Sequence, residues 1–86
     1  MREIIEDALF LGIEEKSFKK EDKTIEFKKI SFLDGKNNFV EATLDKEAEL
    51  PEQLPEAREE CVIDFEMEER QGKNGAYIAK RVYGVS

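Results

Sequence analysis

Residues 24–44, TIEFKKISFLDGKNNFVEATL, predict a β-hairpin. The turn chemistry lies at Asp34–Asn38, where Gly and Asn tolerate a positive φ at little cost and so favour a tight reversal. Apolar residues rich in β-propensity recur along both arms, as expected for strands that each bury one face. They are Ile25, Phe27, Ile30 and Phe32 in the first arm and Phe39, Val40, Ala42 and Leu44 in the second.

The apolar alternation changes phase once within the first arm, at Lys28-Lys29. A shift of one residue inside a strand indicates a β-bulge, which bends the strand and increases its twist. Such a bend is typical of a sheet that curls into a barrel.

Three further strands are predicted on either side of this hairpin, over residues 8–18, 60–69 and 76–85. Residues 60–69 alternate most cleanly, and Cys61 falls on their apolar side as a small buried hydrophobe. Gly12 suits a bend in the first strand. Residues 1–7 are predicted as a short lead-in, and a helix over Arg2–Leu11 is the competing interpretation because its apolar residues also fall near helical spacing.

Two alternatives stay open in the remaining segments. The last strand either turns Ile78 and Val82 inward, with Lys80 at the rim, or turns in Tyr77, Ala79, Tyr83 and Val85. The crossover after Leu44 contains Pro51 and Pro55, which exclude a continuous strand or a long helix. We expect at most one helical turn there, capped by Asp45 and ending by Leu50.

The predicted order is strand, hairpin, Pro-containing crossover and second hairpin, in a single domain over residues 1–86. This is an all-β chain with the layout of a five-stranded, OB-fold-like Greek-key barrel. A split-barrel or SH3-like arrangement of the same strands is the alternative.

The composition argues against an enzyme. The chain has no histidine and one cysteine, so neither a zinc site nor an internal disulfide can be drawn, and the commonest proton shuttle is missing. We therefore expect no catalytic residues, no metal and no cofactor. No apolar run is long enough to span a bilayer and the N-terminus lacks a secretory leader, so we expect a soluble, cytoplasmic protein that does not contact a membrane.

The net charge of −7 argues against nucleic acid when taken alone, but the charges are segregated. Residues 16–29 hold six lysines and three acids, and residues 70–81 hold four basic residues and no acid. Residues 45–69 hold eleven acids and two basic residues. The acidic crossover indicates a solvated surface, a face for a basic partner, or a region that repels DNA and so confines binding to the opposite side.

Residues 42–85, ATLDKEAELPEQLPEAREECVIDFEMEERQGKNGAYIAKRVYGV, resemble the second half of the small OB-fold single-stranded-DNA-binding proteins of phages and mobile elements. The likeness is one of layout, since a strand, a proline-containing connector, an alternating strand, a Gly-rich turn and a last strand follow at similar spacing. It extends loosely over the whole chain. The acidic crossover departs from that family. The resemblance implies binding of single-stranded nucleic acid.

In an OB-fold, the connectors between strands one and two and between strands four and five grip oligonucleotides. Here these are residues 19–23 and 70–75, within the two basic segments. The predicted groove cations are Lys16, Lys19, Lys20, Lys23, Lys28, Lys29, Arg70, Lys73, Lys80 and Arg81. The predicted stacking residues are Phe32, Phe39, Tyr77 and Tyr83, joined by Phe27 if a bulge turns it outward. Phe10, Phe18 and Phe65 are assigned to the core.

The sequence therefore predicts a non-catalytic protein that binds single-stranded nucleic acid, DNA in preference to RNA. The alternative is a protein-interaction module that uses its acidic face or a free sheet edge. A homodimer is compatible with the exposed edges of so small a barrel.

Overall fold

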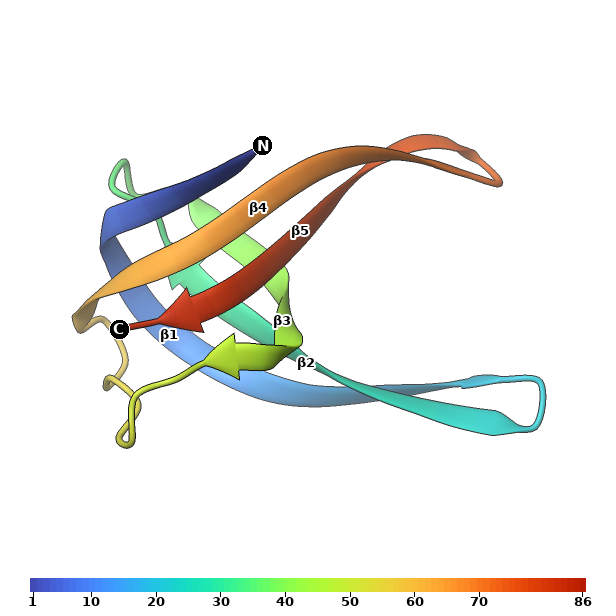
Figure 1. Cartoon of the computed structure of the whole chain (residues 1–86), viewed down its shortest axis with the longest axis horizontal. Helices are drawn as coiled ribbons and strands as arrows, with labels where there is room; N and C mark the ends of the chain where they lie inside the picture. Colours follow the sequence, from blue (N-terminus) through green and yellow to red (C-terminus); the bar gives the residue numbers. More distant parts are fainter.

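The computed structural model describes residues 1–86 and contains five strands and no helix (Figure 1). The structure thus contains no helix that could cross a membrane. The predicted all-β class is confirmed. The strands are β1 (Arg2–Lys20), β2 (Lys23–Leu33), β3 (Phe39–Glu49), β4 (Glu60–Gly72) and β5 (Gly75–Val85).

The five strands form one sheet that closes on itself. Neighbours follow the order β1-β2-β3-β5-β4, and β4 returns to pair with the first half of β1. All pairs are antiparallel except β3 and β5, which run parallel because the crossover of residues 50–59 carries the chain past one strand position. The predicted hairpin of residues 24–44 is present as β2 and β3.

The core fills the inside of this closed sheet with alternate residues of every strand. Phe32 of β2 and Phe65 of β4 meet at its centre, with ring centroids 5.7 Å apart in an edge-to-face arrangement. The predicted core positions of Phe10 and Phe65 are confirmed. That of Phe18 is wrong, because its side chain is 48% exposed.

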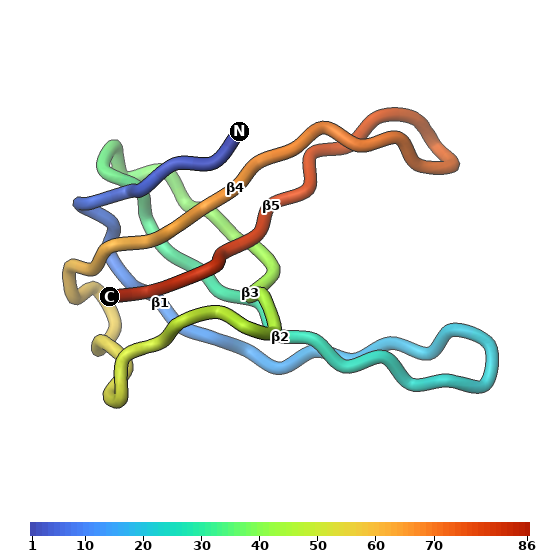
Figure 2. The backbone as a smooth tube through the Cα atoms, viewed as in Figure 1, coloured from blue at the N-terminus to red at the C-terminus, as the bar shows by residue number.

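Two hairpins extend beyond the closed part of the sheet, and we call them the β1–β2 arm (residues 14–29) and the β4–β5 arm (residues 67–80). Both extend toward the same side of the molecule (Figures 1 and 2). Pairing continues to the ends, so the connectors reduce to the two-residue turns Glu21-Asp22 and Lys73-Asn74. Phe18 is exposed because it lies on an arm, past the end of the core.

The predicted bulge at Lys28-Lys29 is wrong. β2 pairs without a register shift with both β1 and β3, and the shifts lie on β1 instead, at Phe10/Gly12 and Ile5/Ala8. The phase change in the sequence has another cause. Ile30 faces the core, whereas Phe27 faces outward on the arm, so the apolar residues occupy opposite faces of one regular strand.

Both helical predictions are also wrong, and so is the lead-in predicted over residues 1–7, since residues 2–7 belong to β1. β1 already begins at Arg2, and its first residues pair with β4, where they satisfy backbone groups of that strand. The turn predicted from Asp45 to Leu50 is replaced by the second half of β3, which bends away from β2 after Leu44 and continues beside β5. Ala48 packs against the core there.

The last strand combines the two predicted phases. Val82 is buried, but a register shift next to Tyr83 inserts an extra residue, so that Val85 is buried as well. Ile78 is 53% exposed because it lies on the β4–β5 arm. Cys61 is buried as predicted, and burial raises the pKa of its thiol.

The loop between β2 and β3 is organised by one carboxylate. Asp34 Oδ1 accepts hydrogen bonds from the backbone N–H groups of Asn38 (2.9 Å) and Lys36 (2.8 Å), and Oδ2 accepts one from the Asn38 amide (3.2 Å). Asn37 takes a φ of 63°, the left-handed conformation that its side chain tolerates. The hydrogen bonds to Asn38 and Lys36 lower the pKa of Asp34 below its ordinary value of 3.8.

These bonds predict an acid dependence of stability. A carboxyl group whose pKa is lower in the folded state stabilises the fold above its unfolded pKa, and that contribution is lost as the pH falls through the folded pKa. We expect Asp34→Asn to lower the melting temperature at neutral pH. Between about pH 5 and about pH 3, the melting temperature of this variant should fall less than that of the wild type. Thermal melts followed by circular dichroism measure both. Asp22→Asn, at the tip of the β1–β2 arm, is the control, and equal behaviour of the two variants would contradict the role of Asp34.

Candidate nucleic-acid interface

The β1–β2 arm has two chemically different faces. Its register places Lys16 opposite Phe27, Phe18 opposite Ile25, and Lys20 opposite Lys23. Because alternate residues of a strand share a face, these side chains lie on one side of the arm together with Lys29. We call this side the cation–aromatic face: Lys16, Phe18, Lys20, Lys23, Ile25, Phe27 and Lys29.

The other side of the arm has a different composition. It carries Glu15, Ser17, Lys19, Thr24, Glu26 and Lys28, with no apolar residue and with two acids balancing two lysines. The cation–aromatic face holds four lysines, and the only acid at its base is Glu14, opposite Lys29. One face therefore attracts anions and offers rings, whereas the other is polar and neutral.

The aromatic rings of the cation–aromatic face contact each other. The centroids of Phe18 and Phe27 lie 5.8 Å apart at an interplanar angle of 66°, and the Lys29 ammonium lies 5.9 Å from the centroid of Phe27. Both rings remain partly exposed. A flat ring beside a cation can stack on a base while the cation pairs with the adjoining phosphate.

The cation–aromatic face continues onto the closed sheet. Lys29, Thr43 and Arg81 are in register on β2, β3 and β5, so the Cα atoms of Lys29 and Arg81 lie about 10 Å apart, two strand spacings. Arg81 is the basic residue that this register adds to the lysines of the arm. Its Nε lies 3.5 Å from Asp45 Oδ1.

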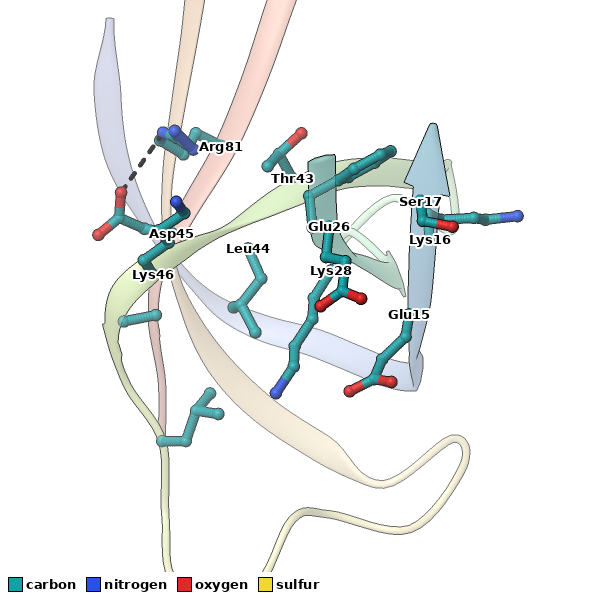
Figure 3. A pocket seen from close by; sticks show the side chains of 13 residues that line it. Glu15, Lys16, Ser17, Glu26, Lys28, Thr43, Leu44, Asp45, Lys46 and Arg81 are labelled. Atoms are coloured by element: carbon teal, nitrogen blue, oxygen red, sulfur yellow. Dashed lines mark ion pairs between the residues drawn. The ribbon is translucent and has the colours of Figure 1, made fainter. Parts of the chain in front are cut away.

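A hollow of about 580 Å³ lies between the base of the β1–β2 arm and the second half of β3 (Figure 3). Its apolar lining is Phe27, Leu44, Ala48 and Leu50, and its rim carries charges of both signs. Lys28 and Glu15 reach it from the arm, whereas Lys16 points away, as its place on the other face requires. The mixed charge makes this hollow a poorer site for phosphate than the neighbouring face.

The β4–β5 arm carries a second, smaller set of the predicted residues. Tyr77 lies opposite Arg70 and is 50% exposed, and its ring packs against Gly72, which has no side chain in the way. Arg70 pairs with Glu68 at 3.3 Å, and Lys73 lies in the turn. Lys80 lies opposite Met67, on the side of the strand that leads into the core.

The structure brings part of the predicted cation set together. Lys16, Lys20, Lys23, Lys29 and Arg81 share one face. Lys19 and Lys28 lie on the opposite side of the same arm, and the other three predicted cations belong to β4–β5. Phe39 is 62% exposed but lies beside the Asp34 loop, at the other end of the sheet from the arms (Figure 1).

Two predicted stacking residues need correction. Phe32 is fully buried and packed on Phe65, so it cannot meet a base. Tyr83 is engaged within the protein: its hydroxyl donates a hydrogen bond to Glu66 (3.0 Å), and the Arg2 guanidinium lies 4.3 Å from the ring centroid. The bond to Glu66 raises the pKa of Tyr83. Neither residue is available as a platform.

Sequence reasoning missed Phe18 and Ile25, and it included Phe27 only through the incorrect bulge. A usable signal was present. Phe18 has the same parity as Lys16 and Lys20, and Phe27 has the opposite parity to Ile30 and Phe32. Uninterrupted alternation would have placed Phe27 outward.

The acidic residues of the crossover lie away from the arms. Residues 50–59 run at the opposite end of the molecule from the two arm tips (Figure 2). They include Glu52, Glu56 and Glu59. These three acids are therefore separated from the arm tips, whereas Glu68 and Glu69 of the same acidic segment lie on the β4–β5 arm.

Comparison with models of known protein families, with curated proteins and with solved structures finds no match.

Proposed function

We propose that this protein binds single-stranded nucleic acid without catalysis, along the cation–aromatic face and across β2 and β3 to Arg81. The observation that carries the proposal is the division of the β1–β2 arm. Its four lysines and three apolar side chains occupy one side, while the other side is neutral and has no apolar residue. Single strands are held by this combination of phosphate-pairing cations and rings that stack on bases.

We also propose that the closed sheet is an OB-type barrel. The strand order β1-β2-β3-β5-β4 and the long hairpins at β1–β2 and β4–β5 support this assignment. In OB-folds, oligonucleotides lie over strands two and three, between these two connections. The resemblance in layout to single-stranded-DNA-binding proteins agrees with the same placement.

A single strand suits this face better than a duplex. The rings of Phe18 and Phe27 can stack only on bases that are exposed, and in a duplex the bases are already stacked on one another. The proposed preference for DNA over RNA rests only on the resemblance to single-stranded-DNA-binding proteins.

The proposal is tested by titrating the protein against a fluorescent single-stranded oligonucleotide of about 20 nucleotides and a matched duplex. We expect preference for the single strand and affinity that falls steeply between about 20 mM and about 150 mM salt. Absence of binding at low salt would exclude the function.

Lys29→Gln tests the location of the site. Each phosphate pair lost should reduce the slope of log K against log salt by about 0.7 for a single strand. We therefore expect this variant to bind more weakly with a shallower slope. Lys36→Gln, in the β2–β3 loop at the other end, removes the same charge and should match the wild type. If both variants behave alike, the cation–aromatic face is not the site.

A protein-interaction module is the second candidate. The arms leave strand edges unpaired, since β2 pairs with β3 only as far as Lys28 and β5 pairs with β3 only from Arg81 onward. A peptide could add to these edges as a further strand. Failure to bind any nucleic acid would favour this function. Two copies are not expected to pair through the cation–aromatic face, because its lysines repel one another.

A further inference from the structure

Arg81 is paired with a carboxylate that the fold holds in place. Asp45 Oδ2 accepts a hydrogen bond from the backbone N–H of Glu47 (3.1 Å), and Oδ1 lies 3.5 Å from Arg81 Nε. The Asp45 side chain is only 24% exposed. Asp45 lies where β3 bends away from β2, so its position follows from the path of the strand.

The other ion pairs near the proposed interface are looser. Lys16 with Glu14 and Arg70 with Glu68 both join well-exposed side chains, and neither carboxylate accepts a backbone hydrogen bond. Exposed pairs of this kind contribute little and separate easily. The Asp45–Arg81 pair therefore differs from them in being anchored.

We propose that Asp45 is an internal counter-anion for Arg81, which a nucleic-acid phosphate must displace in order to bind. Asp45 thereby sets both the affinity of the site and its dependence on salt. This inference rests on the proposed function and adds a specificity-determining residue to it.

The physical basis is the balance of ions. A phosphate that pairs with a free cation releases condensed counterions from the nucleic acid, and this release drives binding at low salt. A phosphate that takes Arg81 from Asp45 also leaves a free carboxylate, which attracts a cation from solution and cancels part of the gain. A ligand with one phosphate therefore competes poorly with Asp45 for Arg81. A nucleic-acid strand competes better, because its neighbouring phosphates bind the lysines of the arm at the same time.

Asp45→Asn tests the inference. Asparagine has nearly the same shape and its amide oxygen can still accept the hydrogen bond from Glu47, so the bend of β3 is preserved. We expect binding of the single strand at physiological salt to be about twofold to fivefold tighter, as expected for loss of a competing partly exposed pair. We also expect the slope of log K against log salt to steepen by about 0.7.

Glu41→Gln is the matched control. Glu41 and Asp45 lie on β3 two residues to either side of Thr43, which faces Arg81, but Glu41 forms no ion pair. Both changes remove one negative charge from the same strand face. We expect Glu41→Gln to alter affinity less and to leave the slope unchanged. Equal effects of the two variants would overturn the inference, because they would show a general effect of net charge.

A double-mutant cycle completes the test. In an Arg81→Gln background, Asp45→Asn should no longer tighten binding, since the cation that it frees is absent. Tightening that persists in this background would also overturn the inference. If the wild-type protein binds no nucleic acid, the proposed function fails and the inference fails with it, whereas wild-type binding with an unaltered Asp45→Asn variant refutes the inference alone.

Discussion

Phe32→Ala is expected to lower the free energy of unfolding by about 3–5 kcal/mol, the cost of a large cavity in a well-packed core. Phe32 is fully buried at the centre of the closed sheet and meets Phe65 edge to face. In a domain of this size such a loss corresponds to a melting temperature about 15–30 °C lower. Thermal and denaturant unfolding followed by circular dichroism measure it.

Phe39→Ala is the control for this prediction, because Phe39 is also on the β2–β3 hairpin but is mostly exposed. We expect this variant to lower the free energy of unfolding by less than about 1 kcal/mol. Phe32→Leu keeps most of the volume and should cost less than the alanine variant, which gives a measurable protein if Phe32→Ala does not fold. Similar losses for Phe32→Ala and Phe39→Ala would contradict the assignment of Phe32 to the core.

Phe27→Leu is expected to weaken binding of the single strand by about fivefold or more, because base stacking on one ring contributes roughly 1–3 kcal/mol. Leucine retains apolar contact with Phe18 and cannot stack. The lysines around position 27 are unchanged, so the slope of log K against log salt should stay that of the wild type. Fluorescence anisotropy at several salt concentrations separates the two effects.

Phe39→Ala again serves as the control, since its ring is exposed but lies at the other end of the sheet from the arms. We expect its affinity to be within about twofold of the wild type, a change of under 0.5 kcal/mol. An equal loss for both variants would move the site toward the Asp34 loop. No loss for Phe27→Leu would remove stacking on the arm from the proposed mechanism.

The local signals of this sequence were sufficient for the strands. The Asp34–Asn38 turn carries its own chemistry, and the alternation around Cys61 and Phe65 marks a strand with one buried face. These patterns predicted five strands, one hairpin at residues 24–44 and a buried Cys61 because each depends on residues close in sequence.

The tertiary structure decided which side of each strand meets water and how far each strand extends. Alternation along a strand predicts that Phe18 and Phe27 lie on a particular face. Their exposure follows from the tertiary structure, because the core ends before the arm on which both residues lie. The first residues of β1 and the second half of β3 are strands because they pair with β4 and β5. Local sequence propensity cannot predict this pairing, because the partner strands are distant in sequence. The pairing of Asp45 with Arg81 joins residues that are far apart in sequence, so it depends on the register of β3 and β5, and register is a property of the closed sheet.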